Sequence, residues 1–152
     1  MDVSTATRGL AAVQAFAATN VPRELGLEVV FGSGAPRGQL YFMLNGGWYG
    51  PSGNLTAVMQ PLLRSFSSPH WSNRYPGNYL DSAKQLAGGS LSTVGSDTPG
   101  TFYAKSMITP RNAPMTENAM RAFMSYLGNQ GTNTSVVRCQ VSALYVSGLT
   151  AT

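Results

Sequence analysis

The sequence predicts a single α+β domain, in which a mainly antiparallel, four-stranded sheet carries its helices on one face. Three observations point to this class. The chain has 152 residues, the usual size of one domain. Two strand-like stretches follow each other directly, whereas the others are separated by stretches of helical spacing. Apolar residues favour one side of the strands, as they do when a sheet is covered on a single face.

The first element is a helix, and the next two form a β-hairpin. Apolar residues at helical spacing predict a helix over residues 4–19, with Ser4 or Thr5 as its N-cap. Residues 27–31 and 39–45 are rich in β-branched, aromatic and other apolar side chains, which is typical of strands. A glycine-rich loop joins the two, and the glycine pair after the second strand is expected to end or bend it.

Two helices are expected in the middle of the chain. Asn54 precedes apolar residues at helical spacing and predicts a capped helix over 54–66, although Pro61 should kink it. A short helix over 79–87 follows an irregular polar stretch. A loop rich in serine, threonine and glycine comes next, over residues 90–100.

The last three elements are a strand, a helix and a strand. Residues 101–108 and 135–146 predict the third and fourth strands of the sheet. Between them, Thr116 caps a predicted helix over 116–127, and Gly128 is expected to stop it.

The composition excludes several functions. Charged residues make up 11% of the chain, against roughly 25% in an ordinary soluble domain. The net charge of +4 comes from few acidic residues rather than many basic ones, and Lys and Arg are scattered, so no nucleic-acid partner is expected. Cys139 is the only cysteine and His70 the only histidine, which leaves no disulfide and no metal site. No membrane span and no signal peptide are visible, so the chain is expected to be cytoplasmic if expressed as it stands.

Six short motifs resemble those of one known family, in the same order along the chain. The family is that of fungal berberine-bridge-type FAD-linked oxidoreductases, those similar to glucooligosaccharide and chitooligosaccharide oxidases. The resemblance covers roughly residues 10 to 145. Near its end Val146 and Ser147 stand where the family has a glycine. The motifs are Glu24–Leu27, Gly46–Gly50, Met59–Leu63, Phe102–Ser106, Met115-Thr116 with Ala119, and Leu144-Tyr145 with Gly148.

The resemblance implies the substrate-binding domain of such an enzyme without its FAD-binding domain. In that family an antiparallel sheet lies over the flavin ring and forms the substrate pocket. FAD is therefore the family's cofactor, but this chain alone is expected to bind none. Strand alternation places six polar or aromatic residues on the face away from the helices, and these are the candidate substrate-binding residues. They are Glu28, Tyr41, Tyr103, Lys105, Arg138 and Gln140.

Three hypotheses about function remain open at this stage. The first is a truncated or split FAD-linked oxidoreductase that oxidises an alcohol or a sugar-like substrate when complete. The second is a flavin-free remnant that acts as a small-molecule binding protein, or as a cofactor-free cyclase or isomerase in a biosynthetic pathway. The third is an inert fragment. The expected partners are a small-molecule substrate and, through the open sheet face, a second copy of the chain or an FAD domain. No catalytic residue is assigned.

Overall fold

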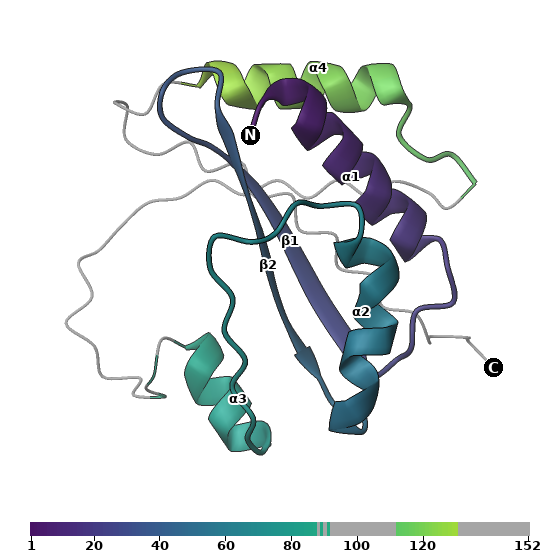
Figure 1. The fold of residues 1–152 in the computed structure, drawn as a ribbon, viewed down its shortest axis with the longest axis vertical. Coiled ribbons are helices and arrows are strands. Elements are labelled where there is room, and N and C mark those ends of the chain that lie inside the picture. The colour runs from purple at the N-terminus through teal and green to yellow at the C-terminus, as the bar shows by residue number, and fades with distance from the viewer. Residues whose placement is uncertain (88, 90, 92–111, 131–152) are drawn as a thin grey trace. The chain divides into compact units, whose positions relative to one another are not determined.

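A computed structural model of the chain describes residues 1–87, 89, 91 and 112–130 (Figure 1). The chain divides into two compact units. One comprises Met1–Ser68 together with Thr109–Thr152, and the other comprises Pro69–Ile108. The described part of the first unit holds two strands and three α-helices, and that of the second holds one helix. The class is α+β, as predicted.

The described residues form a sheet of two strands, so the prediction of a four-stranded sheet is wrong. β1 (Leu25–Ser33) and β2 (Leu40–Trp48) pair antiparallel over nine residues each. The stretches 101–108 and 135–146 lie outside the described residues. A short apolar run does not specify a pairing partner, because β-propensity depends on the packing that surrounds it. The pairing of β1 with β2 can be predicted from the sequence, because the short loop between them brings the two strands together.

Both strands extend further than the sequence patterns predicted. β2 continues through Gly46 and Gly47 to Trp48, so the glycine pair does not end it. Gly46 faces Leu27 across the hairpin, and a β-carbon on Gly46 would collide with the carbonyl oxygen of Gly26. Glycine is therefore required here for close backbone approach rather than for a turn.

Helix α1 (Val3–Ala17) begins one residue earlier than predicted, and its cap is Asp2 rather than Ser4 or Thr5. The Thr5 backbone N–H donates to Asp2 Oδ1 at 2.7 Å. This bond holds the pKa of the Asp2 carboxyl below its ordinary value. The capping interaction is present at neutral pH and is lost as the pH falls through that lowered pKa.

Helix α2 (Leu55–Leu63) follows a 3-10 turn at Ser52–Asn54 and carries Pro61 inside it. Pro61 has no N–H to donate to the carbonyl of Ala57, so α2 lacks that bond in its last turn. Helix α3 (Tyr79–Leu86) lies in the second unit and agrees with the predicted short helix. Its N-terminus has a capping box, in which Asn78 and Asp81 satisfy each other's backbone N–H groups.

Helix α4 (Glu117–Asn129) has the predicted cap: the Thr116 hydroxyl accepts from the Ala119 backbone N–H. The predicted stop at Gly128 is wrong, because α4 includes Gly128 and buries it. The Gly128 carbonyl accepts a bond of 2.8 Å from the N–H of Gly38 in the hairpin loop. Gly128 thus lies where the helix end and the loop approach each other.

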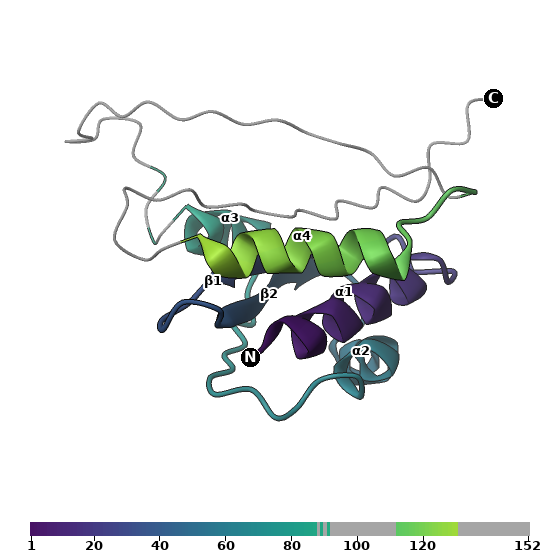
Figure 2. The same ribbon diagram turned by 90° about the horizontal axis from the view of Figure 1, so that it is seen from above.

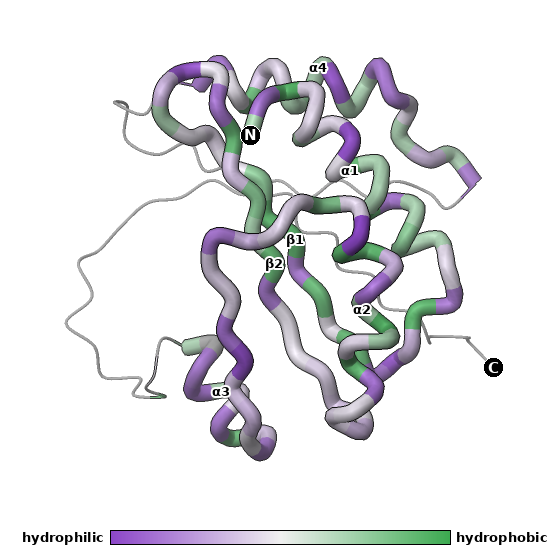
Figure 3. The backbone as a smooth tube through the Cα atoms, viewed as in Figure 1, coloured by the Kyte–Doolittle hydropathy of each residue, from purple (hydrophilic) through white to green (hydrophobic). Residues whose placement is uncertain are grey.

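One hydrophobic core joins α1, α2 and α4 to one face of the hairpin. Val29 and Phe31 of β1 contribute to it, and Phe42 and Leu44 opposite them pack against it. Figures 1 and 2 show α1 and α4 side by side over the strands, and in Figure 3 the hydrophobic colour follows much of β1 and β2. The buried members of the cluster are Ala6, Leu10, Val13, Val29, Phe31, Leu40, Met59, Leu62, Met120, Met124 and Leu127.

A side-chain amide fixes the segment before α4 against α1. The Met115 backbone N–H donates to Gln14 Oε1 at 2.9 Å, and Gln14 Nε2 donates to the Met115 carbonyl at 3.2 Å. Gln14 thereby pairs with both backbone groups of one residue, as a neighbouring strand would. This contact connects residues that are 101 positions apart in the sequence.

Replacing Thr116 with alanine is expected to lower the free energy of unfolding by about 1 kcal/mol. The change leaves the Ala119 N–H without its side-chain acceptor at the start of α4. Urea denaturation followed by circular dichroism measures the loss. Thr116→Ser keeps the hydroxyl and should restore most of it, and equal losses in both variants would contradict a capping role.

Candidate functional site

The face of the hairpin opposite the core carries the strand residues Glu28, Tyr41 and Asn45. Cross-strand pairing places four residue pairs on this second face, which is defined here by their members. Glu28 and Asn45 lie toward one end of the strands, which is called the polar end here, and Tyr41 lies at the other. They are Gly26 with Gly47, Glu28 with Asn45, Val30 with Met43, and Gly32 with Tyr41.

Two tyrosines lie over glycines near the two ends of the second face. The Tyr41 ring covers Gly32, where a β-carbon would collide with it, and Tyr41 remains 45% exposed. Tyr49 lies against Gly47, with its hydroxyl 3.0 Å from the position of a Gly47 β-carbon, and is 58% exposed. At about 3.4 Å per residue, Gly26 and Gly32 are about 20 Å apart. The second face is therefore a strip with a phenol near each end.

A hydrogen-bonded pair lies between the tyrosines. Asn45 Nδ2 donates to Glu28 Oε2 at 3.4 Å, which is a long bond. Both side chains are half-buried. Next to them Met43 is 38% exposed, whereas Val30 is buried at 4%. At the centre of the strip Met43 is therefore the exposed side chain, beside a carboxylate and an amide that are half-buried.

Two of the six predicted substrate-binding residues lie on this face. Glu28 and Tyr41 occupy it together, as strand alternation indicated. Tyr103, Lys105, Arg138 and Gln140 lie outside the described residues. Asn45, Met43 and Tyr49 were not among the predicted residues. Met43 and Asn45 alternate with Tyr41 inside the predicted strand, so the same alternation could have selected them. Tyr49 follows the glycine pair that was expected to end the strand.

Trp48 belongs to the other side of the strand end and packs locally. Its indole N–H donates to the Pro51 carbonyl at 2.8 Å. Its ring lies against Gly50, where a β-carbon would be 2.5 Å from it. Trp48 therefore closes the end of the hairpin rather than presenting its ring to a ligand.

The hollow between α1 and β1 is too small and too apolar to be a ligand site. It holds about 30 Å³, against roughly 300 to 1,000 Å³ for the pocket of a drug-sized ligand. Every residue that lines it is apolar: Val13, Phe16, Ala17, Val21, Leu25, Leu27 and Val29. It is a packing defect of the core.

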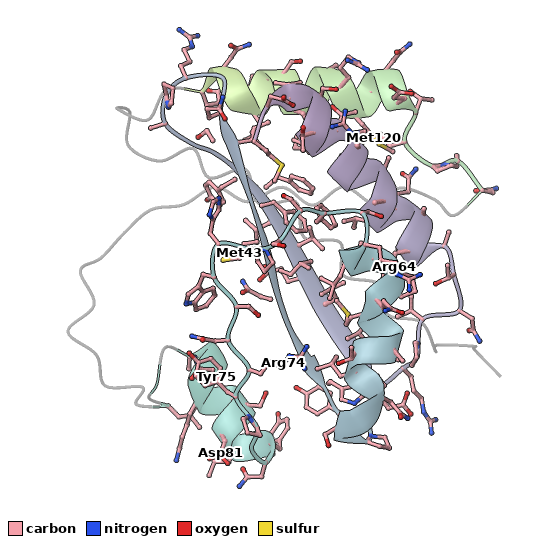
Figure 4. The ribbon with its side chains drawn as sticks, in the orientation of Figure 1. Met43, Arg64, Arg74, Tyr75, Asp81 and Met120 are labelled. Carbon is pink, nitrogen blue, oxygen red and sulfur yellow. The ribbon has the colours of Figure 1, made fainter. Side chains whose placement is uncertain are left out.

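Among the residues that the structure describes, no group of three His, Cys, Asp or Glu side chains could hold a metal ion. Within the same part of the chain, no helix is long and apolar enough to cross a membrane. His70 is exposed in the second unit, in a polar segment. Figure 4 shows Met43 on β2 and Met120 on α4, one from the second face and one from the core.

The comparisons with known proteins place the chain in no group. No protein-family model matches the sequence, and neither a curated protein nor a solved structure is significantly similar to it.

Two substitutions at Tyr41 separate the effect of its ring on stability from the effect of its hydroxyl. An aromatic side chain over a cross-strand glycine stabilises a sheet, so Tyr41→Ala should lower the free energy of unfolding by about 1 kcal/mol. Tyr41→Phe keeps the ring over Gly32 and should leave stability unchanged, because the ring makes the contact that stabilises the hairpin. Chemical denaturation of both variants measures this. If Tyr41→Phe is as unstable as Tyr41→Ala, the ring contact is not what stabilises the hairpin.

Proposed function

We propose that this chain is the substrate-side part of a berberine-bridge-type FAD-linked oxidoreductase, and that the second face of its hairpin forms one wall of the site for an alcohol or sugar-like substrate. The family part of the proposal rests on the six sequence motifs in order. The site part rests on a single observation, the strip in which the Glu28 and Asn45 pair lies between two exposed tyrosines.

The chemistry of this strip suits a polyhydroxylated ligand. A carboxylate accepts hydrogen bonds from hydroxyl groups, and the amide of Asn45 can both donate and accept. The exposed rings of Tyr41 and Tyr49 offer apolar surface with a polar tip, which matches a molecule that has apolar and hydroxylated faces. None of these side chains can accept two electrons, so the oxidation itself requires the flavin that a separate domain would hold.

Flavin binding is the first test of the proposal that a separate domain holds the flavin. The purified chain should be colourless, and micromolar FAD should show no fluorescence quenching in its presence. A yellow protein, or micromolar FAD affinity, would contradict the assignment of this chain to the substrate side alone.

Methyl NMR tests the wall directly with a glucose oligosaccharide as the probe. The Met43 methyl should shift during the titration, whereas the methyl of Met120 in the core should not. Glu28→Gln should weaken binding about tenfold, as expected when a bond to a charged group is lost. Glu24→Gln is the matched control, because Glu24 precedes the strand and, within the described residues, its carboxylate pairs with exposed Arg23 at 3.6 Å. Equal effects of the two substitutions, or no shift at Met43, would rule out the second face as the wall.

The second candidate function is a flavin-free binding protein, or a cofactor-free cyclase or isomerase. It is favoured by the same carboxylate, since Glu28 beside Asn45 can move a proton without any cofactor. An in-frame FAD-binding region upstream in the gene supports the first candidate over the second. Oligosaccharide binding without such a region supports the second.

A further inference from the structure

The start of α2 differs from the start of every other α-helix that the structure describes. In α1, α3 and α4 the N-cap side chain accepts a hydrogen bond from the backbone N–H three residues later. Asn54, the N-cap of α2, makes no such bond, although asparagine is one of the best capping residues. The anomaly raises the question of what the Asn54 side chain does instead.

The backbone explains why Asn54 does not cap. The N-caps of α1, α3 and α4 have extended conformations, whereas Asn54 is already helical, with φ −87° and ψ −19°. It ends the 3-10 turn, in which its own N–H donates to the Pro51 carbonyl at 3.0 Å. The turn leads directly into α2, so Asn54 has the backbone of a helical residue and its amide makes no capping bond.

The surroundings of Asn54 are open. Pro51, Ser52, Gly53 and Asn54 are all exposed, and a β-carbon on Gly53 would have no atom within 4 Å. Thr56, two residues after Asn54, is exposed as well. Leu55 between them packs against the core, which anchors this surface segment to α2.

We propose that Asn54 is an acceptor for an N-linked glycan when the chain passes through a secretory pathway. Asn54-Leu55-Thr56 has the asparagine, the non-proline residue and the hydroxyl residue that the modification requires. The exposed, non-capping amide supplies the structural reason that the folded protein can carry the glycan. The low fraction of charged residues supports the proposal. A glycan would add polar surface to a chain that has few Lys, Arg, Asp and Glu side chains.

The reaction is a group transfer with a defined balance. A lipid-linked oligosaccharide pyrophosphate is the co-reactant. The bond between the sugar C1 and the pyrophosphate oxygen breaks, and a bond between C1 and Asn54 Nδ2 forms. Nδ2 loses one proton to a base of the transferase that catalyses the reaction, and the lipid pyrophosphate leaves with the electron pair of the broken bond.

Translation of the full chain with an added cleavable leader, in the presence of microsomal membranes, tests the proposal. Only chains that the membrane protects from added protease are counted, so that failure to enter the lumen cannot hide the result. The second sequon, Asn133-Thr134-Ser135, is removed by Asn133→Gln in every chain. Protected chains should then run with the increment of one glycan, and peptide-N-glycosidase should remove it and leave aspartate at position 54.

Three further substitutions assign the glycan to this sequon. Asn54→Gln and Thr56→Ala should each abolish the increment, and Thr56→Ser should keep it. Protected Asn133→Gln chains without a glycan would overturn the proposal, as would an increment that survives Asn54→Gln. Because Asn54 does not cap α2, unglycosylated Asn54→Gln should also have an unchanged thermal midpoint.

Discussion

Replacing Phe31 with alanine is expected to lower the free energy of unfolding by about 3 to 5 kcal/mol. Phe31 is 0% exposed, and its ring centroid lies 5.1 Å from that of Phe42, which in turn stacks on Phe66 at 4.1 Å. The substitution removes the ring from β1 and leaves a cavity beneath α1 and α4. Since domains of this size are stable by only about 5 to 15 kcal/mol, a large share of the native state should be lost. Urea denaturation followed by circular dichroism measures the effect.

Tyr126→Ala is the matched control for Phe31→Ala. It deletes a ring of similar size from α4, but Tyr126 is 57% exposed and should contribute within about 0.5 kcal/mol. Similar losses in the two variants would show that the core cluster does not carry the stability of the first unit.

Replacing Gly46 with alanine is expected to cost about 3 kcal/mol or more, although it adds a single methyl group. The added β-carbon would overlap the Gly26 carbonyl oxygen and would stand 3.2 Å from the Leu27 α-carbon. Both atoms belong to the backbone of β1, so neither can rotate away as a side chain could. The strands must separate, and overpacking of this kind costs about 1 to 3 kcal/mol even where side chains can adjust.

Gly53→Ala is the control for this substitution. The same methyl group at Gly53 would have no atom within 4 Å, so stability should change by less than about 0.5 kcal/mol. The amide spectrum of Gly46→Ala should also lose the dispersed signals of β1 and β2. A variant that keeps both its stability and those signals would show that the strands do not cross this closely.

The helices could be predicted from the sequence, because their spacing and most of their boundaries are local properties. Thr116 was identified as a cap, and the short helix at Tyr79–Leu86 was predicted within one residue at its end. The errors have a common cause. Asn54 and Gly128 have the right chemistry for a cap and a stop, but neighbours outside their own helices decide their roles. A 3-10 turn makes Asn54 helical, and the loop at Gly38 pairs with Gly128.

The sheet could be predicted only in part. Alternation correctly placed Glu28 and Tyr41 away from the helices, because the opposite face, with Val29 and Phe31, must be apolar to meet them. The number of strands could not be read in the same way. A hairpin follows from a short loop, whereas strands that are far apart in the sequence pair through contacts that no local pattern encodes.

Like the sheet, the candidate site could be predicted only in part. Glu28 and Tyr41 were found because the strand pattern is clear where they lie. Tyr49 was missed because the glycine pair was interpreted as the end of β2. Asn45 lies inside the predicted strand and alternates with Tyr41, so the same pattern could have identified it. Without the continued register, the sequence gives no indication that a second tyrosine lies near the polar end of the strip.

The pairing of Gln14 with Met115 makes the second unit an insertion within the first. The first unit is complete only after the chain has left it at Ser68 and returned at Thr109. Closing a loop costs entropy that grows only with the logarithm of its length, so that doubling the loop adds about 0.6 kcal/mol. During evolution the Pro69–Ile108 segment could therefore be lengthened, shortened or exchanged at little cost to the helices and strands that flank it. The same property makes it the natural place to graft a foreign module onto this protein.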